Sequence, residues 1–253
     1  MNRPYVLGEA TWSGVRETEY SVAVLPWGAT EAHNYHLPYG TDNVQAEQVA
    51  IRAAAQAWEQ GARPVVLPTV PFGVNTTQLD IMLTLNLNPS TQAMILGDLV
   101  SALEQQGIRK LVVVNGHGGN DFRQMIRELQ PLTEVFLSTI NWWSCVDVRQ
   151  FVEEPGDHAG EAETAAMLHL APELVRPLKE AGPGKARQSR LTGVREGWAW
   201  APRRWTQVTA DTGIGNPAKA TPEKGAAYVS AAVQRIAGYL VELHEISLDD
   251  LYA

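Results

Sequence analysis

The chain is organised around the stretch Leu25-Pro-Trp-Gly-Ala-Thr-Glu-Ala-His-Asn-Tyr-His-Leu-Pro-Tyr-Gly-Thr-Asp42. The apolar run at 21–25 predicts a strand that leads into this loop, and a helix is expected directly after it. The loop carries two carboxylates and two imidazoles, at Glu31, His33, His36 and Asp42. Glu31 and His33 are two residues apart, so in an extended segment their side chains point to the same face. These ligand types suit a divalent ion such as zinc, manganese or iron(II), so the stretch predicts a metal site.

Asp42 also has a simpler interpretation. It stands where the helix opens, and aspartate is a common N-cap residue even where no metal is bound.

Composition limits the kind of protein. The 253 residues are 45% hydrophobic and 19% charged, which is typical of a globular chain. The formal net charge of -8 argues against nucleic acid or an anionic membrane as partner. The single cysteine, Cys145, fits a reducing compartment, and no signal peptide or membrane-length apolar run is visible. We therefore expect a cytoplasmic protein.

Strands and helices are expected to alternate along the chain. Strands are predicted at 21–25, 64–67, 81–87, 111–114 and 135–141, and helices at 43–60, 88–106, 122–129, 161–170 and 221–245. The entry segment 6–19 is expected to be irregular or briefly helical, with Trp12 as a packing anchor, and 178–205 is the least regular part. This alternation predicts a three-layer α/β/α sandwich with a mostly parallel central sheet. No composition break marks a second domain, so residues 1–253 are expected to form one catalytic domain.

A second cluster, Asn115-Gly-His-Gly-Gly-Asn120, follows the strand at 111–114. In parallel sheets, sites form beyond the carboxyl ends of the strands, which places His117 near the first cluster. The glycines leave backbone N–H groups free to face an oxyanion. A plain glycine turn that happens to contain a histidine is the alternative.

A third cluster, His158-Ala-Gly-Glu-Ala-Glu-Thr164, opens a predicted helix. Its carboxylates, Glu161 and Glu163, would also be favoured there by the helix dipole alone.

Together the three clusters resemble the motifs of the creatininase (creatinine amidohydrolase) family. Gly213-Ile-Gly-Asn-Pro217, ahead of Ala220-Thr-Pro-Glu-Lys-Gly225, is similar to the C-terminal segment of that family. The resemblance runs from about residue 12 to 240. It implies two divalent metal ions and commonly a hexamer. By position, it implies that Glu31 and His117 bind one metal, that His33 binds the other, and that Asp42 bridges both.

Two departures from the family pattern affect these assignments. Creatinine-cleaving members carry a ligand glutamate where this chain has Gly119, and many relatives have histidine near Asn75-Thr-Thr77. Other members share the glycine and add a glutamate at the position of Glu161. We infer that Glu161 is the fifth ligand, while Glu163 and His36 support the ligands from behind.

The resemblance implies a metal-dependent hydrolase that cleaves a C–N amide bond of a small, polar, cyclic substrate with a hydroxide held between the metals. His158 would carry the proton to the leaving group, and the backbone of Gly118 and Gly119 would help to hold the oxyanion. Creatinine, a formamide or a lactam could be the substrate.

Two alternatives stay open. Some relatives open keto-cyclitol (dehydro-inosose) rings by breaking a C–C bond, and a binding protein without turnover would keep the same fold. Five tryptophans could wall a pocket for a flat ring or pack in a core or interface, namely Trp142, Trp143, Trp198, Trp200 and Trp205.

Overall fold

The fold is built on a four-stranded parallel sheet. A computed structural model describes residues 3–252, and its strand order is β2-β1-β3-β4. The strands are β1 (Val22–Trp27), β2 (Pro64–Val66), β3 (Lys110–Asn115) and β4 (Phe136–Asn141). Every pairing in the sheet is parallel, because helical connections return the chain to the same end after each strand.

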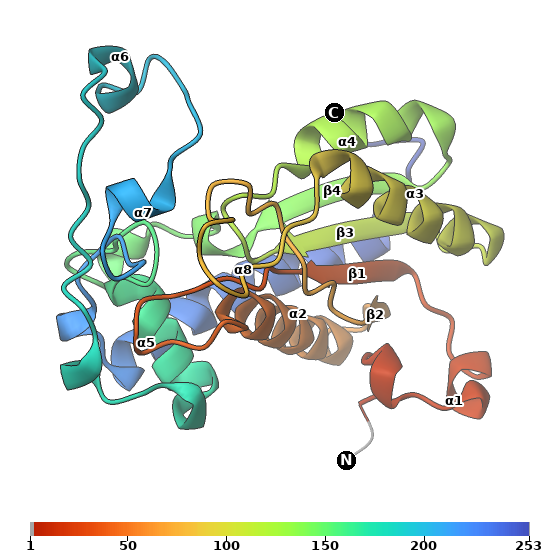
Figure 1. Ribbon diagram of the computed structural model, residues 1–253. Coiled ribbons are helices and arrows are strands. Elements are labelled where there is room, and N and C mark those ends of the chain that lie inside the picture. The colour runs from red at the N-terminus through yellow and green to blue at the C-terminus, as the bar shows by residue number, and fades with distance from the viewer. Residues whose placement is uncertain (1–2, 253) are drawn as a thin grey trace.

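Helices cover both faces of the sheet (Figure 1). One face is covered by α2 (Thr41–Glu59) and α8 (Pro222–Glu245), and the other by α3 (Pro89–Gln105) and α4 (Phe122–Leu129). Alternate residues of β1 serve the two cores: Val22 and Val24 pack on the α2 side, while Ala23 and Leu25 pack on the α3 side. The predicted α/β/α sandwich with a parallel sheet is therefore confirmed.

The remaining helical segments lie outside this sandwich. The helix α5 (Glu161–Leu170) packs against α8 and α2. Figure 1 shows the short helix α6 (Thr192–Arg195) at the tip of an arm that projects from the body. The other short segments are η1 (Leu7–Glu9), α1 (Trp12–Arg16), η2 (Gln130–Leu132), η3 (Trp142–Ser144), η4 (Val148–Gln150), η5 (Pro172–Leu174), η6 (Leu178–Glu180), α7 (Trp205–Val208) and η7 (Pro217–Lys219).

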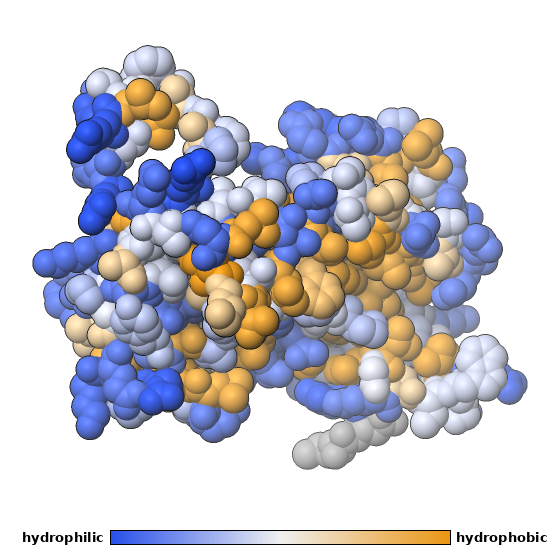
Figure 2. Space-filling model, viewed as in Figure 1, coloured by the Kyte–Doolittle hydropathy of each residue, from blue (hydrophilic) through white to orange (hydrophobic). Residues whose placement is uncertain are grey.

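The strand predicted at 81–87 is not formed, and that prediction is wrong. The segment is a loop with a single bridge between Leu85 and Thr30, and Leu83 adopts φ 62°. Met82 and Leu83 are 82% and 73% exposed. Figure 2 shows apolar side chains gathered over this central loop between β2 and α3. The alternation of apolar residues thus marks an exposed apolar surface instead of a strand.

Trp12 is also not the packing anchor that the sequence suggested. It lies on α1 with 73% of its surface exposed, and the Arg16 guanidinium lies 6.0 Å from the centre of its ring.

Among residues 3–252, no helix combines the length and apolar character needed to cross a bilayer.

Candidate metal centre

Parallel strands bring the three sequence clusters to one edge of the sheet. The last residues of β1, β3 and β4 lie side by side, because Trp27 pairs with Asn115 and Asn115 pairs with Asn141. The loops that follow these strands therefore leave the sheet at the same edge. Two of them carry the first two clusters, and the third leads into Trp142 and Trp143.

Close packing at Gly116 brings the first turn of α2 to the end of β3. A Cβ atom on Gly116 would lie 2.5 Å from the carbonyl oxygen of Asp42 and 3.0 Å from the Cβ atom of Ala46. Only glycine therefore permits this approach. It places Asp42, in the first turn of α2, against His117 at the end of β3.

Five side chains form two groups of potential ligands that share Asp42. In the first group, His117 Nδ1 lies 3.1 Å from Glu31 Oε1 and 3.0 Å from Asp42 Oδ2. In the second, His33 Nε2 lies 3.1 Å from Asp42 Oδ1 and 3.4 Å from Glu163 Oε1. The two oxygens of Asp42 thus face different histidines, which is the geometry required of a bridging carboxylate.

Each histidine in the cluster is oriented by a main-chain carbonyl on its far ring nitrogen. His117 Nε2 lies 3.1 Å from the Val74 oxygen, His33 Nδ1 lies 3.0 Å from the Glu31 oxygen, and His158 Nε2 lies 2.8 Å from the Ala32 oxygen. These nitrogens must donate, so the near nitrogen of a neutral ring carries a lone pair. That lone pair faces carboxylate oxygens, an arrangement that is favourable only with a cation between them. The donor set therefore fits bound metal, with the far-side hydrogen bonds that metal-binding histidines usually have.

Charge pairing in the cluster shifts the pKa values of its members. Burial disfavours charge on His33 and His117, but the neighbouring carboxylates outweigh burial and raise both pKa values well above the usual range. Burial also favours neutral Asp42, yet His33 and His117 hold its pKa well below the usual range. The protein without metal therefore holds protons where metal ions would bind.

We expect metal binding near neutral pH to release protons from His33 and His117, because each must offer a lone pair to the metal. Since both pKa values are raised, protons compete with metal to higher pH, and the apparent affinity for metal should rise with pH. Isothermal titration calorimetry at about pH 7, in two buffers with different ionisation heats, would count the protons released. Metal binding without proton release, or an affinity that does not change between about pH 6 and 8, would contradict these charge states.

Glu163, and not Glu161, completes the second group. Glu161 is fully buried, but its Oε1 atom pairs with Lys224 Nζ at 2.6 Å. Its Oε2 atom accepts the backbone N–H groups of Glu153 and Glu154. The Glu161 carboxylate therefore already accepts three hydrogen bonds, one of them from its charge partner Lys224. These donors lie on the side of the helix away from the cluster. The contacts therefore favour Glu163 over the predicted Glu161 as the additional ligand, and metal content of variants at both positions has to decide between them.

The Glu163 carboxylate is fixed in place by the turn before α5. Its Oε2 atom accepts the N–H group of Ala159 at 2.5 Å, and Ala159 adopts φ 50°, which is uncommon outside glycine. The other oxygen is directed at His33. Burial raises the pKa of Glu163, but His33 and His158 outweigh burial and keep its pKa below the usual value.

His158 lies against the cluster through its other ring nitrogen. Its Nδ1 atom is 3.6 Å from Glu31 Oε1, and its ring lies 4.2 Å from the His33 ring. Trp205 packs edge-on against it at 5.2 Å. The segment is held by paired backbone hydrogen bonds between His158 and Ile214, at 3.0 and 2.7 Å. The C-terminal motif 213–217 therefore supports this histidine.

His36 stands behind the cluster and not in it. Its Nε2 atom is 2.8 Å from Thr164 Oγ1, and burial lowers its pKa to about 4. A neutral His36 thus ties the first loop to α5 next to Glu163, which agrees with a supporting role.

Gly118 and Gly119 have different surroundings. Gly118 lines the pocket in front of the cluster, and Gly119 does not. A Cβ atom on Gly119 would overlap the Val74 carbonyl oxygen and the His117 ring. With this placement of the loop, no side chain fits at position 119, and the additional carboxylate of the second group comes from Glu163 on α5.

Two residues that support the site were not found from the sequence. The buried amide of Gln78 donates to Glu31 Oε2, which leaves Oε1 directed at His117. The side-chain oxygen of Asn120 accepts the Val74 N–H group at 3.0 Å and so fixes the carbonyl that orients His117. Asn120 belongs to the second sequence cluster, but the sequence did not indicate its supporting role. Nothing in the sequence indicates that Gln78 lies next to Glu31.

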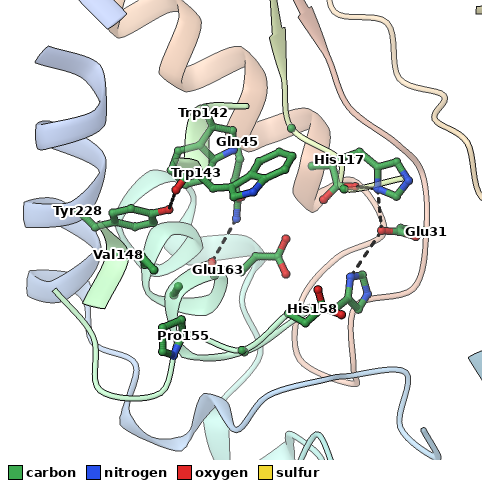
Figure 3. A pocket seen from close by; sticks show the side chains of 17 residues that line it. Glu31, Gln45, His117, Trp142, Trp143, Val148, Pro155, His158, Glu163 and Tyr228 are labelled. Carbon is green, nitrogen blue, oxygen red and sulfur yellow. Dashed lines mark hydrogen bonds and ion pairs between the residues drawn. The ribbon is translucent and has the colours of Figure 1, made fainter. Parts of the chain in front are cut away.

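The tryptophans have three different roles. Trp142 and Trp143 line the pocket (Figure 3). Trp205 is buried and packs against His158. Trp198 and Trp200 are largely exposed near α6. The predicted aromatic wall is therefore made by Trp142 and Trp143, joined by Tyr228.

Known proteins resemble this chain in sequence and in fold. A family model described as creatininase, creatinine amidohydrolase, matches residues 8–240. The mycofactocin precursor peptide peptidase of Mycobacterium tuberculosis is 29% identical, over 92% of this chain and 91% of that protein. A crystal structure from Bacteroides fragilis, assigned provisionally as a creatinine amidohydrolase, has a TM-score of 0.94 and 42% identity over 100% of both chains. A mutant creatininase solved in a Zn-Zn form has a TM-score of 0.79 at 24% identity, covering 96% of this chain and 99% of that one, which shows the shared fold.

Proposed function

This chain belongs to the creatininase family, and on that premise we propose that it is a metal-dependent hydrolase that cleaves a C–N amide bond of a small polar substrate. The observation that carries the proposal is the pair of ligand groups that share Asp42. Glu31, His117 and Asp42 would hold one divalent ion, and His33, Glu163 and Asp42 the other. Zinc, manganese and iron(II) all suit these nitrogen and oxygen donors. Two such ions supply a water activated near neutral pH and polarise a carbonyl oxygen.

The protein supplies the proton transfer through His158. Its Nε2 atom is committed to the Ala32 carbonyl, so Nδ1 is the atom that takes up and returns a proton. That atom faces the cluster next to Glu31, and the ring is held between His33 and Trp205. This position suits protonation of the leaving nitrogen.

The N–H group of Gly118 is the remaining candidate for holding the oxyanion, since Gly118 lines the pocket while Gly119 does not. Of the two backbone N–H groups expected to hold the oxyanion, only that of Gly118 is therefore retained. One catalytic domain over 1–253 and homo-oligomeric assembly are further proposals, which follow from family membership.

A hydrolysis panel tests the proposed function. The protein loaded with zinc, manganese or iron(II) would be incubated with creatinine, formamides, lactams and keto-inositols. We expect turnover of at least one C–N substrate that stops with chelator and returns with added metal. Turnover of keto-inositols alone would instead show a C–C hydrolase, and metal-independent turnover would contradict the proposed mechanism.

Exchange of the two glutamates on α5 tests the ligand assignment. We expect Glu163→Gln to lose one metal ion of two, because the second group keeps only His33 and Asp42, fewer than the three protein ligands common at catalytic sites. Glu161→Gln should keep both ions and lower the Tm by a few degrees, because it removes the buried one of the two charge partners of Lys224. Metal content and thermal unfolding, measured for both variants, distinguish a metal ligand from a glutamate that only stabilises the fold. Loss of metal in Glu161→Gln with full metal in Glu163→Gln would reverse the assignment.

A further inference from the structure

The pocket in front of the cluster has two unlike sides (Figure 3). On one side lie the carboxylates and imidazoles of the cluster. The other side is apolar and aromatic, and it is formed by Trp142, Trp143, Val148, Pro155 and Tyr228. A substrate whose carbonyl reaches the cluster must therefore place its non-reacting part against this second side.

Within the described chain, neither lysine nor arginine lines this pocket, whereas four carboxylates do: Glu31, Asp42, Asp157 and Glu163. Two cations near the pocket are already paired. Arg203 forms an ion pair with Asp157, and Lys224 is shared by Glu161 and Glu153. Recognition of phosphate or carboxylate groups in proteins depends mainly on free guanidinium or ammonium groups, and the lining offers none.

The helix N-termini at the pocket do not provide positive potential either. The first turn of α2 contains Asp42, and the first turn of α5 contains Glu161 and Glu163. These carboxylates offset the partial positive charge of the exposed N–H groups.

We propose that the site selects a substrate whose non-reacting part is flat and apolar, and either uncharged or positively charged, and that it rejects a phosphate or carboxylate at that end. Trp143, which is only partly buried, would face this part, because aromatic faces attract cations as well as apolar groups. This inference rests on the proposed function, since it assumes that the reacting carbonyl meets metal at the cluster.

Hydroxamates bind metal through their own two oxygens and so test the pocket without requiring the true substrate. Three probes would be titrated into the metal-loaded protein by calorimetry: benzohydroxamate, its 4-trimethylammonium derivative and its 4-carboxylate derivative. We expect the carboxylate probe to bind at least about tenfold more weakly than the other two, because its charge finds no partner. Equal or tighter binding of the carboxylate probe would overturn the proposed charge selection while leaving the proposed function intact. Failure of all three probes to bind would overturn the proposed function, and the inference with it.

A substitution on the apolar side provides an independent test. Val148 is half-buried on η4 and belongs to no ligand group, so Val148→Arg brings a cation to the wall without altering the metal site. We expect Val148→Arg to keep its metal and to bind the carboxylate probe more tightly than the unaltered protein does. The control is Val148→Met, whose side chain is long like that of arginine but uncharged, and it should leave the order of the three probe affinities unchanged. An unchanged order in a folded, metal-loaded Val148→Arg protein would contradict the inference. If Val148→Arg does not fold, the three-probe comparison on the unaltered protein decides alone.

Discussion

Replacement of Asp42 by alanine is expected to remove both metal ions and, with them, all metal-dependent turnover. One oxygen of Asp42 lies 3.1 Å from His33 Nε2 and the other 3.0 Å from His117 Nδ1. Loss of this carboxylate would leave Glu31 and His117 at one position and His33 and Glu163 at the other. Two protein ligands are fewer than the three that catalytic sites commonly retain, so neither ion should stay tightly bound.

Metal content of the purified Asp42→Ala protein measures this effect directly. Asp157→Asn is the matched control, because Asp157 lines the same pocket but pairs with Arg203 and belongs to none of the ligand groups. We expect the control to keep both ions. A full metal complement in Asp42→Ala would show that Asp42 is not the bridge and serves only in the first turn of α2.

Replacement of His158 by alanine is expected to lower turnover by roughly 10²–10⁴-fold while the metal stays bound, which is the usual contribution of a general acid–base group. His158 Nδ1 is farther from Glu31 Oε1, at 3.6 Å, than His117 Nδ1 is, at 3.1 Å. The ions would keep three protein ligands each without it. The loss should therefore fall on proton transfer.

Turnover of the substrate found in the hydrolysis panel would be measured beside metal content. His169→Ala provides a control on the same helix, because His169 lies at the far end of α5 near Arg52. We expect His169→Ala to keep both its metal content and its turnover. If metal content in His158→Ala falls in proportion to turnover, His158 is a ligand, since it can form a third group with Glu31 and His33.

The sheet and most helices could be predicted because local pattern and burial agree. The central residues of β3, 111–114, are all apolar, as expected when helices cover both faces of the sheet. The helices α4 and α5 begin and end at the predicted residues. The parallel order then places the ends of β1 and β3 together. For this reason the convergence of Glu31, His33 and His117 followed from the sequence.

The segment at 81–87 could not be predicted correctly because its apolar alternation serves no sheet. A strand needs an edge to pair with, and this loop makes one bridge to Thr30 while the four strands pair among themselves. Exposure of Met82 and Leu83 is a property of the surface that local sequence does not encode. The exposure of Trp12 likewise could not be predicted from the residues around it.

The choice between Glu161 and Glu163 depended on a contact distant in sequence. Their separation by two helical positions did predict that only one could face the cluster. Which one does so is set by Lys224, which lies 63 residues away on α8 and pairs with Glu161. No feature of the segment 158–164 alone reveals that partner.

Elemental analysis of the protein, purified without chelator, tests the central claim most directly. The two ligand groups that share Asp42 predict about two divalent ions per chain, following the two-metal pattern of hydrolytic sites. Fewer than about one tightly held ion per chain, in protein never exposed to chelator, would contradict the metal centre and the hydrolase built on it.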